Sequence, residues 1–98
     1  MEMKPLRESD IRRYFYEQAA ANGVRAEKFT SPSNRDVPDE IVTVTWGRMY
    51  LVELKRPGGG LRPGQARDHE ERAKLGIKVY VLDTYAAVDV FFRLIGNM

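Results

Sequence analysis

The chain has 98 residues, 43% of them hydrophobic, which is enough for one domain with a single modest core. It has no cysteine and one histidine, so disulfide bonds and cysteine-ligated zinc are excluded and a bound metal would need oxygen ligands. Its net charge of +2 is too small to indicate by itself that the protein binds nucleic acid. No apolar run approaches the length of a membrane span or a signal peptide, so we expect a cytoplasmic protein.

A helix is predicted over residues 8–21, because apolar residues recur there at three- and four-residue spacing and Asn22-Gly23 supplies a C-terminal stop. Ser9 or the residue before it is the expected N-cap. Glu8 suits the positive end of the helix dipole, and that role alone would explain its presence.

A short strand is expected over residues 24–29, followed by a loop over 30–36 that is rich in turn-forming residues. The basic and hydroxyl groups of this loop suit contacts with phosphate, although most loops of this kind are simply solvated.

The next segment predicts a β-hairpin, with strands at Ile41–Trp46 and Met49–Lys55 and a tight turn at Gly47-Arg48. Both strands are rich in β-branched and aromatic residues. Trp46 and Tyr50 flank the turn and are interpreted as packing groups rather than base-stacking groups.

Charged residues gather at the open end of this hairpin. Glu53 and Lys55 lie two residues apart and point to the same face, while Val52 and Leu54 point to the opposite one. Asp39 precedes the first strand, so the hairpin brings it to Glu53 and Lys55. Two converging carboxylates suggest a hard divalent cation between them, with the lysine orienting water or stabilising phosphate charge; the alternative is a solvated surface.

A glycine-rich crossover over residues 56–64 leads to a second helix, predicted over 65–75, with Gln65 in its first turn facing the hairpin. A strand over 77–82 follows and is expected to be parallel to its neighbour, because a helical crossover links the two. The candidate buried positions of this helix are Ala66, His69, Ala73 and Leu75. His69 is interpreted as a partly buried residue outside the catalytic set.

The last helix is predicted from Asp83-Thr84 to about Ile95, and its apolar residues occupy more than one face. One face can pack on the sheet, and the other, with Phe91 or Phe92, meets either a second subunit or the first helix. The whole order is αβββαβα, an α/β fold with helices flanking one central mixed sheet, in a single domain spanning residues 1–98.

Several of these residues, taken in order, resemble the motif of a known family. The ordered set Glu8, Pro38-Asp39, Glu53-Leu54-Lys55 and Gln65 resembles the PD-(D/E)XK nuclease superfamily, and within it the VRR-NUC (virus-type replication-repair nuclease) family. The likeness extends over almost the whole chain, and it implies a restriction-endonuclease-like core forming one VRR-NUC nuclease domain. A lone Pro-Asp or Glu-X-Lys is a weak signal, but the ordered set at this spacing is specific.

The resemblance implies a role for each of these residues. Asp39 and Glu53 would be metal ligands, with the Leu54 carbonyl completing the site and Glu8 contributing directly or through water. Lys55 would position the attacking water or the scissile phosphate, and Gln65 would help to hold the site together. Glu17 lies on the same predicted helix and competes with Glu8 as the first acidic group.

The implied activity is Mg²⁺- or Mn²⁺-dependent hydrolysis of DNA phosphodiester bonds, with the number of ions left open. Small stand-alone members resemble phage or viral enzymes that resolve Holliday junctions as homodimers, so the expected substrate is branched DNA in a bacterial host cell. The basic residues expected to contact DNA are Arg12, Lys28, Arg35, Arg56 and Arg62. The alternatives are a nuclease without junction preference, a non-catalytic nucleic-acid-binding module and a plain structural protein.

Overall fold

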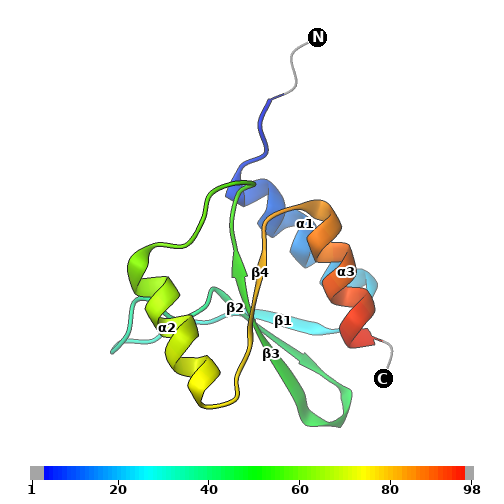
Figure 1. Cartoon of the computed structure of the whole chain (residues 1–98). Coiled ribbons are helices and arrows are strands. Elements are labelled where there is room, and N and C mark those ends of the chain that lie inside the picture. Colours follow the sequence, from blue (N-terminus) through cyan, green and yellow to red (C-terminus); the bar gives the residue numbers. More distant parts are fainter. Residues whose placement is uncertain (1–3, 97–98) are drawn as a thin grey trace.

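The computed structural model describes residues 4–96, and its elements follow the predicted order αβββαβα (Figure 1). The elements are α1 (Glu8–Ala21), β1 (Arg25–Lys28), β2 (Glu40–Val44), β3 (Arg48–Leu54), α2 (Pro63–Lys74), β4 (Val79–Leu82) and α3 (Tyr85–Gly96), with a 3₁₀ turn η1 (Thr45–Gly47) between β2 and β3. None of the helices in this part of the chain has the length and apolar character that a membrane crossing would need.

The four strands form one mixed sheet in the order β1-β2-β3-β4. β1 and β3 each pair antiparallel with β2, and β4 pairs parallel with β3. The parallel pairing confirms the prediction for the strand that follows the helical crossover. Glu53 pairs with Val81, so the end of β3 lies inside the sheet between β2 and β4.

Helices cover both faces of the sheet, with α1 and α3 side by side on one face and α2 on the other (Figure 1). The core lies under α1 and α3, where Phe15 and Phe92 meet with ring centroids 5.4 Å apart. Val52 and Leu54 of β3 are fully buried in this core, as predicted from the pleat. The core comprises Ile11, Phe15, Ala19, Val42, Val52, Leu54, Leu82, Val88, Phe91, Phe92 and Ile95.

The hairpin between β2 and β3 differs from the prediction of a tight turn at Gly47-Arg48. Its loop is the three-residue η1, and Val44 pairs directly with Arg48. Trp46 and Gly47 both adopt left-handed backbone angles, with φ of 68° and 71°. Trp46 is 89% exposed, so its interpretation as a packing group was wrong, because a left-handed residue at the loop tip points into water.

The ends of the helices also correct parts of the sequence interpretation. Arg7, and neither Ser9 nor Glu8, is the N-cap of α1, and its N–H donates to the Asp10 carboxylate at 2.8 Å. The second helix begins at Pro63, two residues before the predicted start, because the fixed φ of proline suits a first helical turn. The strand predicted over 77–82 begins at Val79.

The predicted burial along α2 was wrong at three of four positions. Ala66, Ala73 and Leu75 are exposed, and His69 is partly buried. The buried residues of the helix are Gln65 and Asp68, which are polar. The inner face of α2 therefore lies over a polar site rather than over the apolar core.

The two faces of α3 are both accounted for within one chain. Phe91 and Phe92 are 2% and 3% exposed, because α1 covers the side of α3 that the sheet does not. Neither phenylalanine therefore forms an exposed apolar patch, which leaves Val90 and Leu94 as the outward apolar residues of the helix, at 55% and 56% exposure.

Candidate active site

Asp39 and Glu53 meet where β2 begins and β3 ends. Asp39 directly precedes β2, and its Oδ2 accepts a hydrogen bond of 2.9 Å from the Leu54 N–H. Glu53 lies next to Asp39 across the same gap, close enough for the Asp39 carboxylate to raise the pKa of Glu53. The structure thus brings together the two carboxylates that the hairpin pattern predicted.

The Glu53 carboxyl group is fully buried and has partners on both oxygens. His69 Nε2 lies 3.1 Å from Oε1, and the amide nitrogen of Gln65 donates to Oε2 at 3.5 Å. Burial, followed by the neighbouring Asp39 carboxylate, raises the pKa of Glu53 to about 8, while Lys55 acts in the opposite direction. In the protein alone, Glu53 therefore keeps its proton at neutral pH.

The first turns of α2 hold Gln65 and His69 against this carboxyl group. Gln65 Oε1 accepts the N–H of Arg62 at 3.0 Å, which fixes the start of the helix and leaves the amide nitrogen for Glu53. His69 follows four residues later and therefore lies on the same face of the helix. Burial lowers the pKa of His69, which favours a neutral ring beside the protonated Glu53.

Asp68, three residues after Gln65 on α2, ties the loop over residues 30–36 to the helix. Its carboxylate accepts from Asn34 at 2.9 Å and from Arg72 at 2.8 Å. The Arg72 guanidinium also lies over the ring of Phe29, 5.7 Å from its centroid. These contacts of Asp68 and Arg72 hold both ends of the loop that leads to Asp39 against α2.

Arg12 of α1 connects the acids on the other side of the site. Its Nη2 lies 3.3 Å from Glu8 Oε2 and 3.6 Å from Asp39 Oδ2, and its Nε lies 3.5 Å from Glu40 Oε1. Glu40 is 1% exposed and also accepts a hydrogen bond from the Tyr16 hydroxyl. Burial raises the pKa of Glu40, and Tyr16 and Arg12 oppose that rise.

Glu8 and Glu17 occupy different surroundings on α1. Glu8 shares Arg12 with Asp39, and its negative charge contributes to the raised pKa of Glu53. Glu17 is 61% exposed, and its Oε1 lies 4.0 Å from Arg13 Nε. The geometry therefore favours Glu8 as the acid of α1 that belongs to the site.

The basic residues predicted to contact DNA are spread around this end of the molecule. Arg12 lies among the acids, and Arg62 lies 3.8 Å from Asp36. Lys28, Arg35 and Arg56 are exposed.

Glu40 and Tyr16 escaped the sequence analysis, and His69 is partly buried as predicted but also contacts Glu53. His69 stands at the helical spacing from Gln65 that would have placed both on one face, and that spacing was the available signal. Glu40 and Tyr16 gave no comparable signal, because a charged residue at the start of a strand is normally solvated, whereas Glu40 is buried and contacts Tyr16 and Arg12 of α1.

The carboxylate oxygens in this cluster suit a divalent cation that prefers oxygen ligands. The Asp39 carboxylate and burial both raise the pKa of Glu53, and a hard cation would relieve that crowding of negative charge. Within residues 4–96, no three acidic or histidine side chains already stand together in the arrangement of a metal site. The carboxylate pair is therefore the centre of the candidate site, and Glu8 lies on the far side of Arg12.

The mixed sheet and the acids at its end define a PD-(D/E)XK nuclease core. A solved structure described as a VRR_NUC domain superposes with a TM-score of 0.78 at 28% identity, covering 92% of this chain and 95% of that one. "Putative nuclease p44" of Acyrthosiphon pisum secondary endosymbiont phage 1 is 38% identical over 82 residues, 84% of this chain and 88% of the phage protein. No family model matches the chain. The chain belongs to the VRR-NUC family of nucleases.

Proposed function

We propose that this protein is a metal-dependent, structure-selective DNA endonuclease that hydrolyses phosphodiester bonds. The observation that carries the proposal is the meeting of Asp39 and Glu53, with Lys55 and Gln65 beside them, in a VRR-NUC fold. A surface that only bound phosphate would gain nothing from buried acids at its centre. The phage relative is itself named as a nuclease.

Asp39, Glu53 and the Leu54 carbonyl would hold Mg²⁺ or Mn²⁺, with Glu8 contributing directly or through water. The ion, when bound, lowers the pKa of a water molecule and neutralises charge on the phosphoryl oxygens. Arg12 is bound to both Glu8 and Asp39, so it holds these two acids at a fixed separation.

The remaining residues act on the acids or on the substrate. Gln65 and His69 fix the rotamer of Glu53 through one oxygen each. Lys55 follows the end of β3, where its own N–H is bound to the Leu82 carbonyl at 3.1 Å, so its backbone is rigid. From that anchored position the ammonium group orients the attacking water or the scissile phosphate.

Branched DNA, such as a four-way junction, is the proposed substrate, and the acting form is proposed to be a homodimer. Two symmetric incisions require two active sites related by a two-fold axis. Within residues 4–96, no element beyond the nuclease core is present to read bases, so recognition rests on DNA shape and on the basic residues around the site.

The test is cleavage of a labelled four-way junction beside a matched linear duplex, in Mg²⁺ and in Mn²⁺, by wild type and Lys55→Ala. We expect the junction to be cut selectively and Lys55→Ala to lose at least about a hundredfold in rate. Arg25→Ala, which removes a positive charge from β1 where Arg25 pairs with Glu27 at 3.3 Å, is the matched control and should cut normally.

Other results of this cleavage test would favour one of the alternative functions. Equal cutting of both DNAs keeps the active site and removes the junction preference. Binding without cutting would indicate a non-catalytic nucleic-acid-binding module. Intact junctions, flaps and splayed arms without detectable binding would overturn the proposed function.

A further inference from the structure

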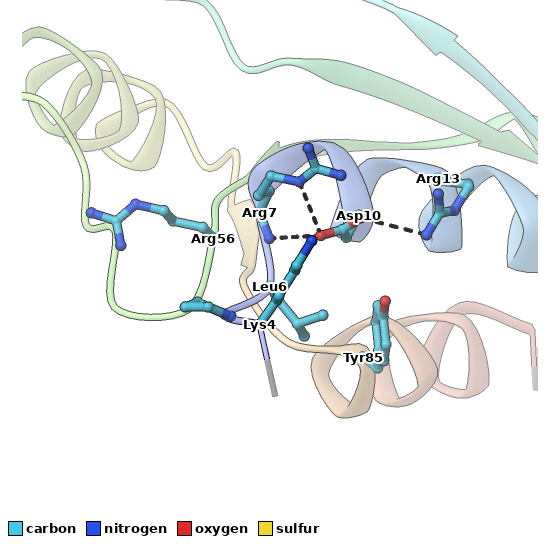
Figure 2. A pocket seen from close by; sticks show the side chains of 8 residues that line it. Lys4, Leu6, Arg7, Asp10, Arg13, Arg56 and Tyr85 are labelled. Carbon is cyan, nitrogen blue, oxygen red and sulfur yellow. Dashed lines mark hydrogen bonds and ion pairs between the residues drawn. The ribbon is translucent and has the colours of Figure 1, made fainter. Parts of the chain in front are cut away.

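A cavity lies between the N-terminal end of α1, the loop after β3 and the start of α3 (Figure 2). Its volume of about 640 Å³ lies within the range of pockets that bind small organic molecules, and it exceeds what a single phosphate group needs. The charged side chains around it are Lys4, Arg7, Arg13 and Arg56, with Asp10 among them.

Asp10 keeps the arginines in place rather than cancelling the positive charge. Its carboxylate lies 3.6 Å from Arg7 Nε and 3.4 Å from Arg13 Nη2 (Figure 2). The Arg7 N–H is the first cause of a lowered pKa of Asp10, so the carboxylate stays ionised at neutral pH. Four cations against one anion leave the pocket positive, which suits a phosphate group.

The pocket also has an apolar part, formed by Leu6 and the aromatic ring of Tyr85. Tyr85 packs against Tyr14 with ring centroids 4.5 Å apart, and the Tyr14 hydroxyl donates to Asp89 at 2.6 Å. These contacts hold the ring of Tyr85 in place. A fixed aromatic ring beside a cluster of cations is a combination that binds nucleotides, since the cations bind phosphate and the ring stacks on a base.

The pocket and the candidate active site share their chain segments. Arg7 precedes Glu8 and Arg56 follows Lys55 in the chain, so we expect a phosphate held by these arginines to be a neighbour of the scissile phosphate. A base-paired nucleotide would offer only its sugar and phosphate to this surface. The apolar part can be filled only by a base that has left the helical stack.

We propose that the pocket binds one unpaired nucleotide next to the scissile bond, with its phosphate on Arg7 and Arg56 and its base against Tyr85 and Leu6. The inference rests on the proposed function and adds to it a source of selectivity. A continuous duplex offers no such nucleotide, whereas a branch point or flap does. The pocket therefore accounts for preference at branched DNA without reading sequence.

The test compares the binding of a splayed-arm DNA and a duplex of equal length, in the absence of metal so that neither is cut. Arg7→Gln should weaken binding to the splayed arm about tenfold and binding to the duplex by about threefold or less. Arg25→Gln is the matched control, because both side chains are mostly exposed, at 78% and 74%, and both pair with one acid. It should leave the ratio of the two affinities unchanged.

A second readout follows the base itself. 2-Aminopurine placed at the first unpaired position should change fluorescence on binding wild type, and Tyr85→Leu or Leu6→Ala should reduce that change. Equal losses for both DNAs, or an unchanged 2-aminopurine signal with wild type, would overturn the inference. Wild-type cleavage that Lys55→Ala abolishes would still support the nuclease, so the two proposals fail separately.

Discussion

Glu53 keeps its proton at neutral pH in the metal-free protein, because its carboxyl group is fully buried against Asp39. A cation that binds there must displace this proton. The affinity of the site for Mg²⁺ or Mn²⁺ should therefore rise with pH up to about 8, where the pKa of Glu53 lies.

The same group makes the stability of the metal-free protein depend on pH. The pKa of Glu53 is raised from 4.5 to about 8 on folding, so the folded state binds the proton more tightly than the unfolded state. Its contribution to stability is fully present below pH 4.5 and is lost as pH rises through 8. The whole loss is on the order of 5 kcal/mol, of which about 3 kcal/mol falls between pH 5.5 and pH 8.5.

Glu53→Gln should abolish this dependence, because the amide resembles the protonated acid and does not titrate. Urea unfolding in EDTA at pH 5.5 and pH 8.5 measures it, and the Glu53→Gln variant should be more stable than wild type at pH 8.5. Glu17→Gln, at a side chain 61% exposed, is the control and should follow wild type. The same pH slope in Glu53→Gln as in wild type would contradict the assignment.

At the scale of elements, α1 is joined to the sheet by apolar packing and by the Tyr16–Glu40 hydrogen bond. Glu40 is buried, and loss of the Tyr16 hydroxyl would leave one of its oxygens without that donor. The bond therefore ties the helix that carries Glu8 to the strand that follows Asp39.

Tyr16→Phe should lower the free energy of unfolding by about 1–3 kcal/mol, the cost of leaving a buried polar atom without its partner. Tyr14→Phe is the matched control, since it removes a hydrogen bond of α1 to the less buried Asp89, which water can replace. Its expected cost is about 0.5–1.5 kcal/mol. Chemical denaturation measures both, and equal losses would show that Glu40 is not held in this way.

The periodic elements were the predictable ones. The bounds of α1 at Glu8 and Ala21 match the prediction, because a long amphipathic pattern and the Asn22-Gly23 stop both act locally. The hairpin loop was not predicted, since a bulky residue such as Trp46 rarely adopts left-handed backbone angles. The prediction of buried positions along α2 failed for another reason, because the inner face of this helix packs on polar groups.

The residues of the site divide in the same way into those that local patterns predict and those that depend on contacts between distant segments. The pleat alone aligns Glu53 with the side of the sheet opposite to Val52 and Leu54, and the Pro38-Asp39 position follows from the hairpin. Contacts between segments distant in sequence, such as Arg12 with Glu40, depend on how α1 crosses the sheet. Neither periodicity nor local spacing determines that crossing.

At the scale of the whole molecule, the outer side of α3 next to the edge strand β4 is where a second copy would bind. Val90 and Leu94 are more than half exposed there, and with Tyr80 they line a cavity of about 390 Å³. β4 is an edge strand of the sheet, with one side of its backbone unpaired in the described chain. We propose this surface as the dimer interface of the junction-cutting form.

Sedimentation at micromolar concentration should give twice the 11.3 kDa mass of the chain. Val90→Glu with Leu94→Glu should give the single-chain mass while leaving the fold intact, because burying two carboxylates in an interface is costly. Leu75→Glu, at a residue 83% exposed beyond α2, is the control and should sediment like wild type. A wild-type protein of 11.3 kDa would end the dimer proposal.

The exposed indole at the hairpin tip determines what intrinsic fluorescence can report. Trp46 is the single tryptophan, and it is already surrounded by water in the folded chain, so unfolding should change its emission little. The length of β3 places it about 20 Å from Glu53. Its spectrum is therefore a poor probe of denaturation and a selective probe of any molecule that covers the hairpin tip.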